Sequence, residues 1–305
     1  MKTLTTLIGF AILLSTGTIA HAITNQFELL TYRDTGAAIE IIDYPKDVSG
    51  HVDIPSHIDG KPVTAITGGG NPNEFDGAFG NSEISSLSIP NTVTNIGEDA
   101  FGICFYLTEL ILPHGLNHIG NGAFYQCRSL ESIHLGVSLQ SIGAFTFFNC
   151  VSLTRLVVPD TVTEISHFAF QGCNQITTLK LGNGITTLGR SAFNRCNKLT
   201  TVTIPATMTS MQNNSFAICD AMGAAVFLGN APDVEIGNLF NKTAPHFTVY
   251  FLSGRTGFTT PRWLGYPSQE LPAPPTSAQS WLLSHGLAID PAHRAANPCC
   301  WRGWI

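Results

Sequence analysis

Apolar residues recur along the middle of this chain with a period of 23 residues. Each period carries a phenylalanine and, three positions later, a cysteine. The two series are Phe101, Phe124, Phe147, Phe170, Phe193 and Phe216, and Cys104, Cys127, Cys150, Cys173, Cys196 and Cys219. A fixed period of about 20–29 residues is typical of a solenoid, in which each coil buries its apolar face only against its neighbours. We therefore expect a stack of 23-residue coils with a structural ladder of phenylalanines and cysteines.

Within each coil, a short segment has apolar residues two positions apart, which is the period of a β-strand. Leu110-Ile111-Leu112 is one example, and Leu156-Val157-Val158 is its equivalent two coils later. Pro113 and Pro159 follow directly and end the strand, because proline has no N–H group to continue a ladder. The pattern predicts a mainly β fold with one short parallel strand in each coil.

The full repeat carries a family resemblance. The coil that ends at Cys127 reads Leu107-x-x-Leu110-x-Leu112-Pro113-x-x-Leu116-x-x-Ile119-Gly120-x-x-Ala123-Phe124-x-x-Cys127. This template resembles the leucine-rich repeats of BspA-like bacterial surface proteins, and the resemblance extends over about Val52 to Cys219. It implies a leucine-rich-repeat solenoid with N- and C-terminal caps. It also implies a non-catalytic role in binding or adhesion at the cell surface.

The amino terminus has the features of a secretory signal peptide. Lys2 precedes the apolar run Leu7 to Leu14, and Ala20-His21-Ala22 provides small residues for cleavage after Ala22. The alternative is an uncleaved membrane anchor, but the apolar run is short for a span of about 20 residues. We expect a secreted or cell-surface protein with no membrane span after cleavage.

The remaining chain divides into four segments. Residues 23–77 form an N-terminal cap with an irregular first repeat, 78–228 the leucine-rich-repeat solenoid, 229–267 a C-terminal cap, and 268–305 a Pro-rich linker and a disordered tail. The aromatic residues of the C-terminal cap either plug the open end of the core or form a sugar-binding platform. After Asp290 the tail loses any helical or strand period, which suggests a frame-shifted end. A Cys-based attachment tail containing Cys299 and Cys300 is the rival interpretation.

Composition and motifs argue against several functions. The net charge is −6 and only 12% of residues are charged, whereas nucleic-acid binding requires a basic surface. The ladder cysteines lie too far apart in sequence for zinc, whose ligands pair two to four residues apart. Because they point the same way, we expect buried, reduced thiols rather than disulfides. The ten histidines are scattered and no catalytic or nucleotide-binding motif occurs. The sequence therefore predicts no enzyme activity, metal or cofactor.

The outward strand positions form two columns along the solenoid. One column is Ser86, Glu109, Ser132, Arg155, Thr178 and Thr201, and the other is Ser88, Ile111, His134, Val157, Lys180 and Thr203. Apolar residues in the second column indicate a contact surface, although β-branched residues also suit strands in general. The ligand-contact candidates are Ile111, His134, Arg155, Val157 and Lys180.

We predict a secreted leucine-rich-repeat protein that binds an extracellular protein or glycan through the solenoid surface. The first alternative is a structural cell-surface protein without a dedicated ligand, and the second is a secreted hydrolase that uses the C-terminal cap. The sequence also predicts that Phe147→Ala destabilises the fold more than Phe79→Ala, because an end coil has less cover than an interior coil.

Overall fold

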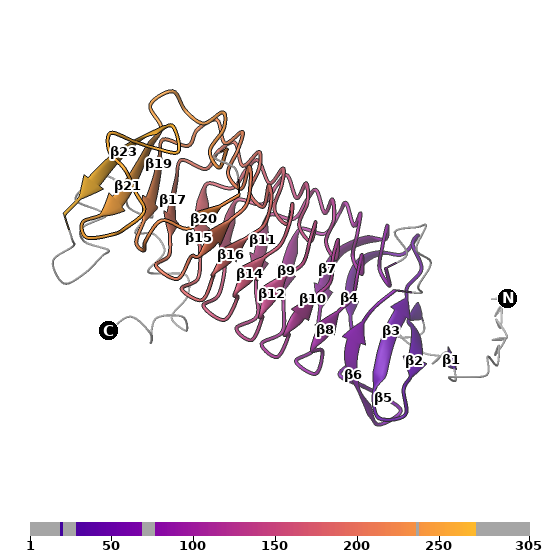
Figure 1. The fold of residues 1–305 in the computed structure, drawn as a ribbon. Coiled ribbons are helices and arrows are strands. Elements are labelled where there is room, and N and C mark those ends of the chain that lie inside the picture. Colours follow the sequence, from indigo (N-terminus) through magenta and orange to yellow (C-terminus); the bar gives the residue numbers. More distant parts are fainter. Residues whose placement is uncertain (1–18, 21–28, 69–76, 236–237, 273–305) are drawn as a thin grey trace, which may run out of the picture.

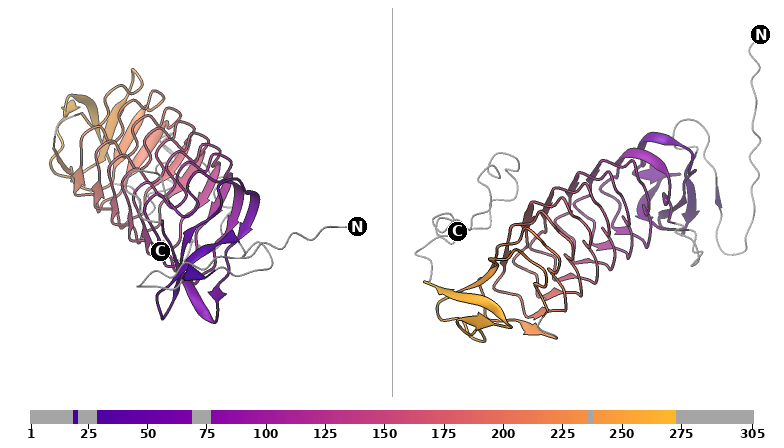
Figure 2. Two further views of the ribbon diagram at one scale, coloured as in Figure 1. Left: turned by 90° about the vertical axis from the view of Figure 1, so that its right-hand side faces the viewer. Right: turned by 90° about the horizontal axis from the view of Figure 1, so that it is seen from above.

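The chain folds into a stack of β coils that follow one another in sequence order from one end to the other (Figure 1). The computed structural model describes residues 19–20, 29–68, 77–235 and 238–272. Within these ranges the chain forms strands and turns and no α-helix. Figure 2 shows the same stack from two further sides. The predicted mainly β solenoid is confirmed.

Most strands are short and recur once in every coil. They are β1 Ile19–Ala20, β2 Thr31–Asp34, β3 Ile39–Asp43, β4 Ser49–Asp53, β5 His57–Ile58, β6 Lys61–Ile66, β7 Glu83–Ser88, β8 Asn95–Ile96, β9 Glu109–Ile111, β10 His118–Ile119, β11 Ser132–His134, β12 Ser141–Ile142, β13 Arg155–Val157, β14 Glu164–Ile165, β15 Thr178–Lys180, β16 Thr187–Leu188, β17 Thr201–Ile204, β18 Ser210–Met211, β19 Ala224–Phe227, β20 Asp233–Val234, β21 Thr248–Leu252, β22 Arg262–Trp263 and β23 Tyr266–Leu271.

Each coil has three sides. The first, which we call the long-strand face, holds β4, β7, β9, β11, β13, β15, β17 and β19. The second, the short-strand face, holds the two-residue strands β8, β10, β12, β14, β16, β18 and β20. The third, the turn face, consists of successive turns that lead to the next coil. The sequence predicts one strand in each coil. The structure contains a second strand of two residues in each coil, which pairs with the equivalent strands of the neighbouring coils.

Strand pairing along the solenoid is parallel and keeps the period of the sequence. Glu109 lies opposite Ser132, and Arg155 lies opposite Thr178. Since neighbouring parallel strands are about 4.8 Å apart, residues one period apart form straight columns. Antiparallel pairs occur at the ends, where β2 pairs with β1 and β3, β5 with β6, and β22 with β23.

The turn face contains left-handed residues at two positions of each coil. One column is Asp99, Gly122, Phe145, Phe168, Ser191 and Asn214, and the other is Ile103, Gln126, Asn149, Gly172, Arg195, Ile218 and Lys242. Because of this backbone conformation, every second N–H group of the turn face points along the stack towards the next coil. The N–H groups of Asp99, Phe101 and Ile103 donate to carbonyls of the next coil at 2.9, 2.7 and 2.6 Å. This row of hydrogen bonds runs in one direction, with its donors facing the C-terminal end.

The phenylalanine ladder occupies the centre of the core. Successive rings from Phe101 to Phe216 stack at centroid distances of 5.1–5.2 Å, and each is fully buried. Phe79 stacks on Phe101 at 5.0 Å and is covered on its other side by Tyr44 at 4.8 Å. The premise that Phe79 has less cover than Phe147 was therefore wrong, because the N-terminal cap supplies an aromatic ring of its own.

Each ladder cysteine makes a regular polar contact. Its thiol donates to the carbonyl oxygen of the ladder phenylalanine in the preceding coil, at sulfur–oxygen distances of 3.1–3.7 Å. All six thiols are free and buried. Burial raises the pKa of Cys127 and Cys150 well above the ordinary value and that of Cys219 to about 12. The column combines apolar packing with a weak hydrogen bond that sequence reasoning did not foresee.

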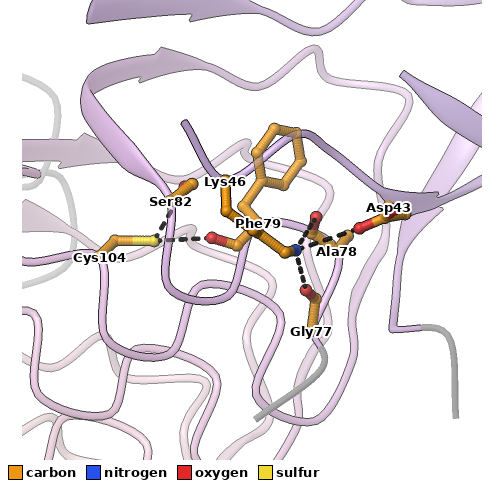
Figure 3. Close-up of polar contacts among 7 residues, drawn as sticks. All are labelled: Asp43, Lys46, Gly77, Ala78, Phe79, Ser82 and Cys104. Atoms are coloured by element: carbon orange, nitrogen blue, oxygen red, sulfur yellow. Dashed lines mark hydrogen bonds and ion pairs between the residues drawn. The ribbon is translucent and has the colours of Figure 1, made fainter. Parts of the chain in front are cut away.

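The row of hydrogen bonds on the turn face begins with carbonyl acceptors at the N-terminal end and finishes with N–H donors at the C-terminal end, so its two ends need different partners. At the N-terminal end no earlier coil supplies donors, and the Lys46 ammonium donates to the carbonyl oxygens of Gly77 and Ala78, both at 3.3 Å (Figure 3). Asp43 pairs with the same ammonium at 3.1 Å. At the C-terminal end the Phe240 N–H donates to the Tyr266 hydroxyl at 3.1 Å. A donor side chain therefore caps one end and an acceptor side chain caps the other.

Aromatic residues close the C-terminal end of the core. Phe240 stacks on Phe216 at 5.9 Å and meets Tyr266 edge-on at 5.5 Å, while Trp263 is buried against Phe227 at 5.3 Å. Strand β23 continues to Leu271, past the boundary predicted at residue 267, because it pairs with β21. The predicted signal peptide lies outside the described residues except for Ile19–Ala20, which pairs with β2. The tail after Pro272 also lies outside them.

Candidate binding surface

The long-strand face carries all five ligand-contact candidates predicted from the sequence. Ile111 lies on β9, His134 on β11, Arg155 and Val157 on β13, and Lys180 on β15. Ile111 is the most exposed large apolar side chain of the described residues, at 59%. Strand β9 pairs with β11 and β13 pairs with β15, and between these two pairs the Thr154 N–H donates to the Glu131 carbonyl at 3.3 Å.

Two opposite charges on this face have no ion-pair partner among the described residues. Glu109 on β9 and Arg155 on β13 lie in the same outward column, with Ser132 of β11 between them. Two strand spacings separate them, which is about 10 Å. No ion pair joins them across this separation, and Glu109 is exposed while Arg155 is partly exposed.

At the N-terminal end of the face, four polar residues form a hydrogen-bonded network. The ring of His51 contacts the Ser86 hydroxyl through Nδ1 at 2.7 Å, and contacts Asp53 and the Ser88 hydroxyl through Nε2, both at 3.0 Å. Hydrogen bonds from Ser88 and then His51 lower the pKa of Asp53. These are the residue types of a serine-hydrolase triad, which scattered sequence positions did not reveal. The His51 and Asp53 side chains are 46% and 58% exposed, so we interpret the network as a polar part of the surface.

Threonine ladders run beside the strands. The hydroxyls of Thr154 and Thr177 donate to carbonyls one coil earlier at 3.3 and 3.2 Å. Thr163 and Thr186 do the same near the short-strand face at 3.3 and 3.1 Å. The hydroxyl hydrogens are therefore used within the fold, and these columns offer mainly acceptors to a ligand.

A group of aromatic rings on the turn face was missed by the sequence analysis. Tyr125 stacks on Phe148 at 5.2 Å, Phe148 lies 5.7 Å from Phe145, and Phe145 stacks on Phe168 at 4.8 Å. Phe145 and Phe168 occupy a left-handed column whose other members are Asp, Gly, Ser and Asn, which tolerate that backbone conformation better. The sequence feature that could have revealed this group is a second phenylalanine, Phe145 or Phe168, two residues before the ladder phenylalanine.

The described residues contain neither a cluster of metal-ligating side chains nor a helix that could cross a membrane. The two main surface depressions are open rather than enclosed. One is lined by Glu131, Val151, Ser152, Thr154, Asn174 and Gln175. This arrangement suits surface contacts rather than the enclosure of a small molecule.

Two solved structures are similar to this chain. A leucine-rich repeat protein from Bacteroides ovatus ATCC 8483 is 17% identical, with a TM-score of 0.51, and the match covers 86% of this chain and 77% of that one. The T. pallidum leucine-rich repeat protein is 24% identical over 74% of this chain and 85% of its own, with a TM-score of 0.49. The likeness to the Bacteroides ovatus protein concerns the fold alone. No curated protein matches the chain.

A family model for the BspA type leucine-rich repeat region matches residues 75–158 and 140–242, in six copies. These two ranges together span more than half of the chain, and they contain the whole ladder from Phe101 to Cys219. The resemblance seen in the repeat template is therefore confirmed. The chain belongs to the family of BspA-type leucine-rich-repeat proteins.

Proposed function

We propose that this protein is a secreted or cell-surface binding module whose long-strand face contacts an extracellular protein or glycan without catalysis. The single observation that carries the proposal is the exposed Ile111, placed on a rigid strand between polar and charged neighbours. An exposed apolar side chain with a polar surround is typical of the centre of a contact surface.

The physical properties of the face support this proposal. Its outward side chains project from hydrogen-bonded strands, so little backbone freedom is lost when a partner docks. Ile111 and Val157 supply apolar area, while Arg155 and Lys180 supply charge for orientation and steering. The threonine ladders beside them add acceptors at regular intervals. The amino-terminal sequence and the family to which the chain belongs support a location outside the cell.

A binding panel of extracellular matrix proteins and immobilised glycans tests the proposal. The double variant Arg155→Glu/Lys180→Glu should lose the specific binding that the unchanged protein shows. The matched control is Arg190→Glu/Arg195→Glu, which makes the same change in net charge on exposed turn-face residues. Equal melting temperatures would show that both variants are folded. Loss of binding only in the turn-face control, or in neither variant, would refute the proposal.

A further inference from the structure

The long-strand face has a charge pattern that is related to itself by a two-fold rotation. Taking β11 as the centre, Glu109 lies one strand towards the N-terminal end and Arg155 one strand towards the C-terminal end. Both occupy the same outward column. Ile111 and Val157 occupy the equivalent places in the other column.

A second copy can be placed face to face by a rotation of 180° about an axis parallel to β11 in the plane of contact. This rotation exchanges strands before and after β11 and keeps each column in place. Glu109 of each copy then lies opposite Arg155 of the other, and Ile111 lies opposite Val157. Every contact occurs twice, as in an isologous two-fold interface.

We propose that the long-strand face binds a second copy of this chain in this antiparallel arrangement. The inference rests on the proposed function, because it names the partner of that same surface. Charge complementarity selects this partner. Glu109 and Arg155 form no ion pair in the described residues of one chain, and the rotation places each opposite its complementary charge in the other copy.

The outer strands are compatible with the same arrangement. Ser86 and Ser88 on β7 lie opposite Thr178 and Lys180 on β15, and the network around His51 on β4 lies opposite the threonines of β17. None of these facing positions brings two like charges together. Figure 1 shows coils stacked without a sharp bend, so several strands can meet at once.

One like-charge pair arises at the edge of the contact. Glu131 directly precedes β11 and is exposed, so the rotation places it near its own equivalent in the second copy. Repulsion between these two carboxylates weakens the association. The arrangement therefore predicts that Glu131→Gln strengthens self-association, an effect that a contact elsewhere on the molecule would not produce.

Sedimentation velocity over a concentration series tests the proposal. The unchanged protein should show a reversible monomer–dimer equilibrium. Glu109→Arg alone and Arg155→Glu alone each create two like-charge pairs, so each should weaken dimerisation at least about tenfold. An equimolar mixture of the two variants should dimerise again, because both pairs become attractive in the heterodimer. The double variant Glu109→Arg/Arg155→Glu should also recover.

Failure of this inference can be told apart from failure of the proposed function. An unchanged protein that stays monomeric at the highest attainable concentration overturns the inference, as does a dimer that is insensitive to the single variants or is not restored by mixing. The binding panel, run on the same preparations, reports independently whether the face binds another molecule. Unchanged melting temperatures of the single variants exclude misfolding as the cause of a lost dimer.

Discussion

At the scale of single residues, the cysteine column shows how one side chain can meet two demands. The position is fully buried and also lies next to a carbonyl oxygen of the preceding coil. A thiol is apolar enough for the first and can donate weakly to the second. In the first coil Ser82 takes this place, where it is buried and lies 3.5 Å from the sulfur of Cys104. This column therefore favours small side chains that can donate a hydrogen bond.

The thiols should be protected in the folded protein. Burial blocks access and raises the pKa of Cys127, Cys150 and Cys196 well above the ordinary value, so little thiolate forms near neutral pH. Thiol titration should find few reactive groups in the native protein and about six more in denaturant, one for each ladder cysteine. Disulfides between ladder cysteines in unreduced peptides, measured by mass spectrometry, would contradict this expectation.

A second prediction concerns Asp99, a half-buried carboxylate on the turn face. Burial, and then the neighbouring charge of Glu98, raises the pKa of Asp99. A raised pKa means that the folded state disfavours the ionised form, so Asp99 lowers stability once the pH rises above the ordinary value of about 3.9. Asp99→Asn should therefore raise the free energy of unfolding at pH 7 by up to about 1 kcal/mol.

The pH dependence provides the check on that variant. The advantage of Asp99→Asn should shrink as the pH falls through the pKa of Asp99, because the carboxyl group is then neutral in both states. Asparagine also tolerates the left-handed backbone at this position, as Asn214 does in the same column. The exposed Asp47, changed to Asn, controls for net charge. A stability gain that persists unchanged in acid would refute the electrostatic explanation.

The phenylalanine ladder provides a third prediction. Phe147 and Phe79 are both fully buried, and each is stacked between two rings. Truncation of either to Ala should cost about 3–5 kcal/mol, with similar shifts in the denaturant midpoint. Tyr44→Ala should remove the cover of Phe79 and leave the surroundings of Phe147 intact. A Phe79→Ala variant far more stable than Phe147→Ala would indicate that the cap packs loosely.

At the scale of elements, the ends of the stack are set by two capping side chains. Lys46→Met removes the donor to the carbonyls of Gly77 and Ala78, and Tyr266→Phe removes the acceptor for the Phe240 N–H. Each should lower the free energy of unfolding by about 1–2 kcal/mol. Because the sites lie at opposite ends, the two effects should add. Lys198→Met, at an exposed position, is the control. A double variant no less stable than the single ones would contradict the capping role.

The sequence predicts the repeated part of this fold well and the individual contacts of the caps poorly, for a physical reason. A strict 23-residue period places Phe on Phe and Cys on Cys, so the stacking direction, the strand register and the core follow from spacing alone. Lys46, Tyr44 and Tyr266 act through contacts that occur once, between residues without a repeat to align them. No local pattern marks such contacts.

The candidate surface shows the same division. The outward positions of Ile111, Arg155 and Val157 follow from strand alternation, and the structure places them on one face. The polar network around His51 could not be predicted, because a shifted register between β4 and β7 brings its residues together. The aromatic group on the turn face could not be predicted for a related reason. Alternating left-handed residues turn Phe145 outward, and the strand period does not describe that conformation.

At the scale of the whole molecule, the solenoid is a continuous stack of coils, and one of its strand faces carries exposed apolar and charged residues. The core runs without a break from the N-terminal cap to Trp263. Since each coil contacts only its neighbours, a partner that spans several coils meets a surface whose spacing is fixed by the backbone. We therefore expect partners to contact this protein on the long-strand face.

Site-specific photo-crosslinking tests this claim most directly. A photoreactive amino acid replaces Ile111 on the long-strand face, and in matched variants it replaces Val137, exposed beside that face, or Arg190 on the turn face. The full-length protein is irradiated both alone and with the binding panel, and adducts are mapped by mass spectrometry. We predict adducts from position 111, including links to a second copy near Val157, and few or none from position 190. Adducts that form mainly from position 190, with none from position 111, would show that contact does not take place on the long-strand face.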